Sequence, residues 1–173
     1  MSYTYTVNDI AVFLLVANFK LSDEQKTLHK LWREQKYIDE KYLHNEAAFK
    51  REIRRERALI MPGVLDDLDE LDLIMRDVDP NYELFNSNYE RDAILQFFKI
   101  IRLELLYIEN RDYYKIKLRR LLKHFKYKRR SQALIQNIKH AMTLLSLTPY
   151  LRGHVPCDLA LIDIDDMVMI RLK

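Results

Sequence analysis

Residues 104–123 read ELLYIENRDYYKIKLRRLLK and lie in a long segment that contains no glycine or proline. Apolar residues recur there at steps of three and four, on both sides of a polar interruption at residues 109–112. They are Ile94, Phe98, Ile101, Leu105 and Ile108, followed by Leu118, Leu121, Leu122 and Phe125. Because this period is typical of an amphipathic helix, we expect one helix over roughly residues 89–126. At about 1.5 Å per residue it would be longer than a small domain is wide, so it would belong to a bundle or span a subunit interface.

Shorter helices are expected on both sides of this stretch. Ser22-Asp23-Glu24-Gln25 forms a capping box, which predicts a helix that begins at Ser22. Pro80 separates the long helix from the residues before it, because proline disfavours helical geometry in the preceding residue. The other predicted helices cover roughly residues 5–19, 45–60, 65–74 and 131–147.

The apolar period changes from helical to alternating near the C-terminus. Ala160, Ile162 and Ile164 recur at every second position, and so do Val168, Ile170 and Leu172. Period two predicts strands, with a turn at Asp165-Asp166. The expected fold is therefore mainly α: a helical bundle with one long central helix over residues 1–148, followed by the start of a small β element over residues 149–173.

The charges are unevenly distributed along the chain. The formal net charge of the 173 residues is only +3, but residues 66–79 hold seven acids against one arginine. The basic stripe at residues 115–130 holds no acid and consists of Lys115, Lys117, Arg119, Arg120, Lys123, Lys126, Lys128, Arg129 and Arg130. The two segments face each other or face partners. The single cysteine and the lack of a signal peptide pattern favour a reducing cytosolic or nuclear compartment, and no apolar run indicates a membrane role.

The sequence offers no recognisable catalytic or metal-binding motif. With two glycines in the chain, neither a P-loop nor a dinucleotide-binding fingerprint can be written, and the five histidines form no helical metal motif. Metal ligands are one interpretation of Asp163, Asp165 and Asp166. We favour the other, in which they lie on the solvated face of a strand and in the turn after it. We expect the Cys157 thiol to be inert and not a nucleophile. We expect no enzyme activity, no catalytic residues, no metal and no cofactor.

Two segments resemble a known family. The first is Leu31-Trp32-Arg33-Glu34-Gln35-Lys36, followed by Glu40 and Leu43. The second is Glu104-x-Leu106-x-Ile108-x-x-Arg111-x-Tyr113-x-Lys115-x-Lys117-Leu118-x-Arg120-Leu121-x-Lys123. Both are similar in order and spacing to segments of the Sld-five-type subunit of the eukaryotic GINS complex, W-x-x-E-[KR]…E-L-L and E-R-L-x-F-x-x-R-S-Y-[IL]-R-x-R-L-x-K-I-x-K. The chain departs from these patterns where Gln35 replaces an acid, Leu105 an arginine, and Lys115 and Lys117 two further arginines.

The resemblance implies a structural role in the nucleus. GINS is a four-subunit assembly that joins the MCM ring and a further component to form the replicative helicase, which acts in the initiation and elongation of DNA replication. Each subunit is a helical bundle with a small β domain, so residues 149–173 would hold the linker and first strand or strands of a truncated β domain. The partners would be the sister GINS subunits, with DNA contacted only indirectly or weakly. The expected interface residues are Trp32, Ile108, Arg111, Tyr113, Lys117, Leu118, Leu121 and Phe125.

Three alternatives stay open at this stage. The apolar stripe suits an interface with a sister subunit, but it also suits the chain's own core. The basic stripe suits a solvated face, but it also suits a nucleic-acid-binding module in which Lys115, Arg119, Arg120, Lys123, Lys126, Lys128, Arg129 and Arg130 follow phosphates. Near the N-terminus, Ile10, Phe13 and Leu14 suit a helix that covers the chain's own core, or one that docks a replisome adaptor if they are exposed.

Overall fold

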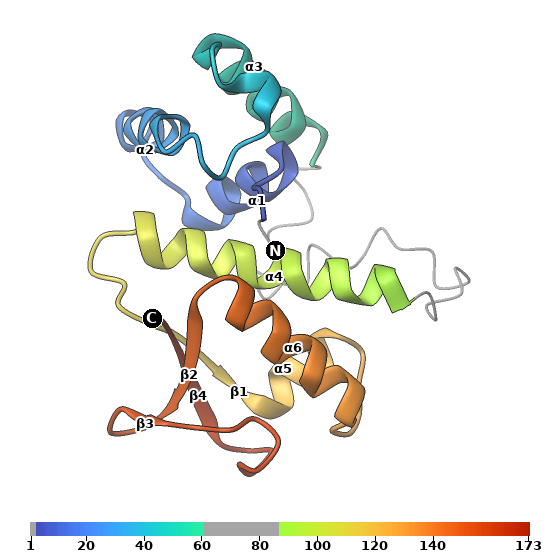
Figure 1. The fold of residues 1–173 in the computed structure, drawn as a ribbon. Coiled ribbons are helices and arrows are strands. Elements are labelled where there is room, and N and C mark those ends of the chain that lie inside the picture. The colour runs from blue at the N-terminus through green and yellow to red at the C-terminus, as the bar shows by residue number, and fades with distance from the viewer. Residues whose placement is uncertain (1–2, 61–86) are drawn as a thin grey trace. The chain divides into compact units, whose positions relative to one another are not determined.

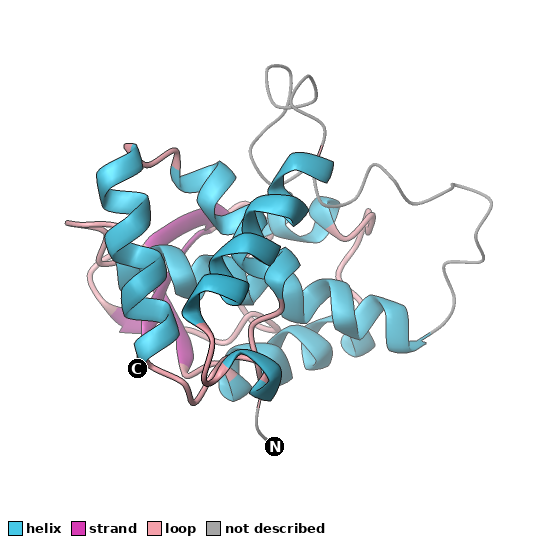
Figure 2. Ribbon diagram, turned by 90° about the horizontal axis from the view of Figure 1, so that it is seen from above, coloured by secondary structure: helices cyan, strands magenta, loops and turns pink. Residues whose placement is uncertain are grey.

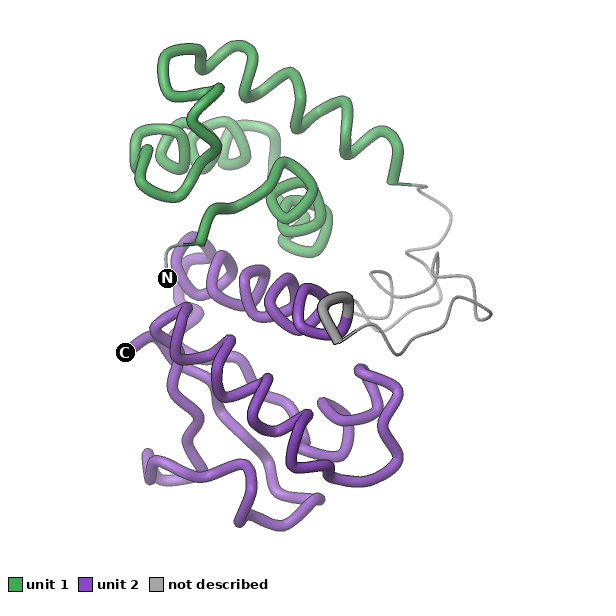
Figure 3. Tube along the Cα trace, turned by 45° about the vertical axis from the view of Figure 1, so that its right-hand side comes forward, with its two compact units in different colours: residues 1–70 green, residues 71–173 purple. Residues whose placement is uncertain are grey.

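The computed structural model describes residues 3–60 and 87–173 of the chain (Figure 1). The chain divides into two compact units, residues 1–70 and residues 71–173 (Figure 3). The first is helical and the second combines helices with a sheet. A mainly α fold is thus confirmed. Within the described ranges, no helix is long and apolar enough to cross a membrane.

Unit 1 contains the helices α1 (Val7–Ala17), α2 (Leu21–Arg33) and α3 (Glu46–Leu59), with the short 3-10 helix η1 (Glu40–Tyr42) before α3. α1 and α2 both contact α3, where Phe49 and Ile53 are almost fully buried. Asn45 caps α3 by accepting a hydrogen bond from the Ala48 amide. The predicted start of α2 at a Ser22 capping box is wrong. The amides of Asp23 and Glu24 both donate to the Lys20 carbonyl, so Ser22 already lies inside the first turn.

Unit 2 contains the helices α4 (Ser87–Tyr107), α5 (Leu118–His124) and α6 (Gln132–Leu144). Its strands are β1 (Tyr114–Lys117), β2 (Leu147–Leu151), β3 (Val155–Pro156) and β4 (Met167–Leu172). They form one antiparallel sheet in the order β1-β4-β2-β3. Figure 2 shows the strands in magenta. The expected boundary after residue 148 falls inside this unit, because β2 begins at Leu147 and pairs with β4.

The predicted continuous helix over residues 89–126 is wrong. α4 ends at Tyr107, Asn110 takes a left-handed conformation at φ 61°, and residues 114–117 form β1. Side chains alternate along β1, so that Ile116 is buried between the exposed Lys115 and Lys117. This short alternation agrees with pairing to β4, where Ile116 lies opposite Val168.

The C-terminal strand prediction is confirmed in its second half only. β4 buries Val168 and Ile170 as the alternation predicts. Residues 158–164 form turns instead of a strand, because the Asp158 carbonyl accepts the amides of Leu161 and Ile162 and the Asp158 carboxylate accepts that of Ala160. The chain then turns at residues 164–165, close to the predicted position.

The core of unit 2 lies between the sheet and its helices. Phe97 of α4 is central to it: its ring centroid lies 5.1 Å from that of Phe98, 4.6 Å from that of His124 and 5.4 Å from that of Phe125. The other fully buried side chains of this core include Ile94, Ile101, Leu118, Leu121, Leu134, Ile138, Leu145, Val168 and Ile170.

Replacing Leu121 by alanine is expected to lower the free energy of unfolding by about 2–5 kcal/mol, because it leaves a cavity in a closed core. Lys123→Ala, an exposed change on the same helix, is expected to stay within about 0.5 kcal/mol of wild type. Urea unfolding of the full chain, followed by circular dichroism, measures both. Equal midpoints for the two variants would show that Leu121 is not a core residue.

Candidate nucleic-acid interface

α6 presents a polar face to solvent. Ser131 caps the helix, its Oγ accepting a hydrogen bond from the Leu134 amide at 3.1 Å. Leu134, Ile135, Ile138, Ala141 and Met142 fix the helix to the core of unit 2. The exposed side chains on the opposite face are those of Gln132, Ala133, Gln136, His140 and Thr143. No residue of α6 is acidic, so the face offers uncharged hydrogen-bonding groups with no carboxylate to repel a polyanion.

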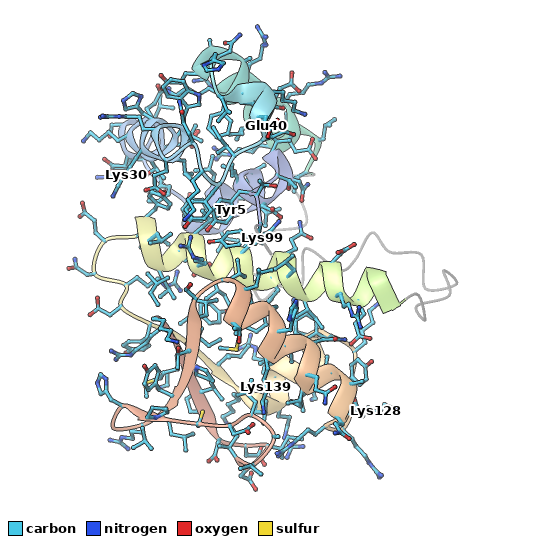
Figure 4. The ribbon with its side chains drawn as sticks, in the orientation of Figure 1. Tyr5, Lys30, Glu40, Lys99, Lys128 and Lys139 are labelled. Atoms are coloured by element: carbon cyan, nitrogen blue, oxygen red, sulfur yellow. The ribbon has the colours of Figure 1, made fainter. Side chains whose placement is uncertain are left out.

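The predicted basic stripe is distributed over three elements instead of one helix face. Lys115 and Lys117 lie on β1, Arg119, Arg120 and Lys123 on α5, and the remaining cations in the loop of residues 125–131. This loop is fixed to α4, because the Tyr127 hydroxyl donates to Glu90 Oε2 at 3.1 Å. Burial, followed by that hydrogen bond, raises the pKa of Tyr127. Lys126, Lys128 and Arg129 are exposed in the loop just before α6, and Figure 4 labels Lys128 there.

Two cations of the stripe hold the loop of residues 158–166 in place. Arg119 binds Asp165 in bidentate fashion at 2.6 and 2.7 Å, which raises the pKa of the guanidinium and lowers that of the carboxylate. Arg130 donates to the carbonyls of Ala160 and Ile162. The sequence did not identify a third contact, from Lys139 of α6 to Asp158 at 2.5 Å. Figure 4 labels Lys139 on this helix. The loop is therefore attached along one edge of α6.

Five of the expected interface residues have contacts inside the chain. Leu118, Leu121 and Phe125 are 0%, 0% and 6% exposed, so they belong to the chain's own core, the alternative that the sequence left open. Trp32 donates its indole N–H to the Tyr42 carbonyl at 2.9 Å. Arg111 Nη1 lies 2.6 Å from Oε2 of the buried Glu104.

The other expected interface residues differ in exposure. Tyr113 and Lys117 are exposed, and Ile108 is half-buried. At the N-terminus, Ile10, Phe13 and Leu14 are at most 1% exposed. The adaptor-docking hypothesis required those three side chains at the surface, so their burial corrects it in favour of the core alternative.

The described ranges contain no group of three or more His, Cys, Asp or Glu side chains arranged to hold a metal ion. Asp163 and Asp166 instead cap turns of the loop, accepting the amides of Asp165 and Asp163 respectively. Burial raises the pKa of the Cys157 thiol, and the negative charges of Asp158 and Asp166 raise it further. A protonated thiol is a poor nucleophile, so this environment favours the inert interpretation.

No family model, curated protein or solved structure matches this chain. The fold of unit 2 is therefore described by the order and pairing of its own elements. In chain order its elements are α4, β1, α5, α6, β2, the two-residue strand β3, and β4. In the sheet, β4 lies between β1 and β2. This order is similar to that of a winged helix-turn-helix domain, with α5 and α6 in the places of its two helices and residues 152–166 in the place of its wing.

The carboxyl groups of Asp158 and Asp165 are expected to titrate below their ordinary pKa of 3.8, because Lys139 and Arg119 stabilise the ionised forms. The two ion pairs are therefore intact above that pH and are lost as the pH falls through the lowered values. Carbon-detected NMR of the side-chain carboxyls measures both midpoints. Lys139→Met should return the Asp158 midpoint towards 3.8 and leave that of Asp165 low. Ordinary midpoints in wild type would mean that the loop is not held by these pairs.

Proposed function

We propose that unit 2 is a duplex-DNA-binding module in which α6 enters the major groove. The observation that carries the proposal is the polar, acid-free outer face of α6, on a helix that stands second in a helix-turn-helix and has its inner face fixed to the core. Helix-turn-helix proteins place that second helix in the major groove. The groove, about 12 Å wide, admits an α-helix.

The side chains on this face suit base recognition. Glutamine can bind adenine in bidentate fashion, and threonine can bond to several base edges. Gln136 and Thr143 lie near the centre of the exposed face, with Gln132 and His140 beside them. A face chosen only for solubility would carry charges of both signs. Contacts to base edges carry the sequence information, and amide and hydroxyl side chains can make them.

The surroundings of α6 suit phosphate contact. Lys128 and Arg129 are exposed immediately before its N-terminus, and Lys126 and Lys123 precede them. The nearest acids of the loop 158–166 are compensated, because Asp158 binds Lys139 and Asp165 binds Arg119. These contacts reduce the repulsion that four aspartates in the loop would otherwise exert on a DNA backbone. Neither base reading nor phosphate contact requires catalytic chemistry of this chain.

The test is selection of duplexes from a random-sequence library by the full chain, followed by fluorescence anisotropy. Gln136→Ala is expected to cost about 1–3 kcal/mol on the selected site and little on unrelated duplexes, because it removes one base contact. Lys128→Ala should weaken binding to all duplexes alike and reduce the salt slope by about one. Lys26→Ala, an exposed change on α2, serves as the control. Failure to select any sequence, with Gln136→Ala identical to wild type, would reject base reading by α6.

A second candidate is the scaffold role in the GINS complex, with the MCM ring as a further partner and the nucleus as its location. It rests on the order of residues in the two segments that resemble the Sld-five-type subunit, of which Tyr113 and Lys117 are accessible. The strand β1 counts against it, because half of the longer segment does not continue the helix that the resemblance implies.

Coexpression with the three sister subunits of one GINS complex tests this second candidate. A scaffold subunit is expected to copurify with them in equal amounts, and Tyr113→Ala to weaken the assembly, because exposed aromatic residues are frequent interface anchors. Size-exclusion chromatography with light scattering measures the stoichiometry. A chain that elutes alone as a monomer beside intact sisters would exclude the scaffold role and leave the DNA-binding proposal unaffected.

A further inference from the structure

We propose that α3 of unit 1 carries a second surface for nucleic-acid phosphates, made by Arg51, Arg54 and Arg55. This arginine face lies outside unit 2 and goes beyond the function proposed for it. It would contact the backbone without regard to sequence, whereas α6 would read bases. One chain would then hold a duplex through two surfaces, which raises the overall affinity above that of either one.

The arginine face lies opposite the buried face of α3. Phe49 and Ile53 are 1% and 0% exposed and fix one side of the helix to unit 1. Arg51, Arg54 and Arg55 are separated by three and four residues, so they point to the other side, and all three are exposed. The exposed Ala47 and Ala58 complete this side of the helix. Alanine neighbours leave the guanidinium groups open to a ligand.

Four other charged groups of α3, those of Glu46, Lys50, Glu56 and Arg57, have partners. Glu46 Oε1 lies 2.6 Å from Lys50 Nζ and 2.8 Å from His29 Nδ1, and these contacts lower its pKa. Glu56 accepts a hydrogen bond from Asn8 at 3.0 Å. Arg57 Nη1 lies 2.6 Å from Glu24 Oε2.

The arginine face differs from these paired groups. Across residues 3–60 and 87–173, no ion pair involves any of its three arginines. The guanidinium groups at these neighbouring helix positions repel one another, and a bound anion would reduce that repulsion.

The chemistry of the face favours phosphates. The planar guanidinium binds phosphate in bidentate fashion, and arginine is enriched where phosphates are recognised. From Arg51 to Arg55 the backbone advances about 6 Å along the helix axis, so the groups can bind successive phosphates of one strand rather than one small anion. A helix that lies on a lipid surface needs a row of large apolar side chains beside its cations. Among the exposed residues of α3, Leu59 alone is large and apolar, and the others beside the arginines are alanines. These features favour a nucleic-acid backbone.

The experiment compares triple variants of the full chain on a labelled 30-base-pair duplex of random sequence. Anisotropy titrations from about 50 to 300 mM salt give the affinity and its salt slope. Replacing Arg51, Arg54 and Arg55 together by glutamine should reduce the slope by about 2–3 and lower the affinity for every sequence. The matched control replaces Lys26, Arg33 and Lys36 of unit 1 by glutamine, which removes the same charge from other exposed positions. Circular dichroism confirms that each variant folds.

The outcomes separate this inference from the function proposed for unit 2. If the arginine variant loses slope and the control does not, while Lys128→Ala matches wild type on this duplex and Gln136→Ala matches it on the selected duplexes, the arginine face stands and the role of α6 falls. If the arginine variant matches wild type or the control, the arginine face is overturned, whatever α6 does. Loss of binding to phosphatidylserine vesicles with unchanged duplex binding would overturn it as well, because the anion would then be a membrane.

Discussion

The pairing of β4 with both β1 and β2 is the constraint on which unit 2 depends. Among the described residues β1 pairs with β4 alone, with Ile116 opposite Val168, and the loop that leads into β4 positions α5. The amides of Leu118 and Arg119 donate to the carbonyls of Asp166 and Ile164, so the segment before β4 fixes the first turn of α5. Residues 164–166 thus lie more than forty residues after the helix turn that they fix. Contacts between residues this far apart in the sequence cost loop-closure entropy. The burial of the core of unit 2 has to offset that cost.

Local signals predicted the helices and missed the strand within the central stretch. The helices expected over residues 45–60 and 131–147 match α3 and α6 closely, and the structure shows Asn45 and Ser131 as their N-caps. Residues 114–117 alternate in burial, but four residues are too few to outweigh a helical apolar period on both sides. What makes them a strand is β4, more than fifty residues away, and no local propensity reports such a partner. The same reasoning explains residues 158–164, where the carboxylate and carbonyl of Asp158 compete successfully with a strand ladder.

The candidate site was predicted in composition but not in arrangement. The cations of residues 115–130 are mostly exposed, as a charge run requires, yet their division among β1, α5 and a loop follows from tertiary structure. The apolar stripe could not be assigned to a core or an interface from spacing alone, since both bury the same residues. Leu118 and Leu121 show this most clearly, because both are fully buried within the chain. The outer face of α6 did carry a readable signal: a helix without a single acid, whose exposed positions are Gln132, Ala133, Gln136, His140 and Thr143.

The use of cations inside unit 2 bears on how it would select DNA. Arg119 and Arg130 hold the loop 158–166, and Lys139 binds Asp158, so three positive groups near α6 are engaged before any ligand arrives. Sequence-independent affinity grows with the number of phosphates neutralised, so in the proposed function engaging these groups would lower the affinity for every duplex equally. Contacts from uncharged side chains to base edges are unaffected. A module of this kind would bind all duplexes more weakly and would still distinguish between their sequences. The ratio of specific to nonspecific binding is the quantity that matters among many competing sites. The arginine face of α3 would then restore affinity from a separate surface without altering that choice.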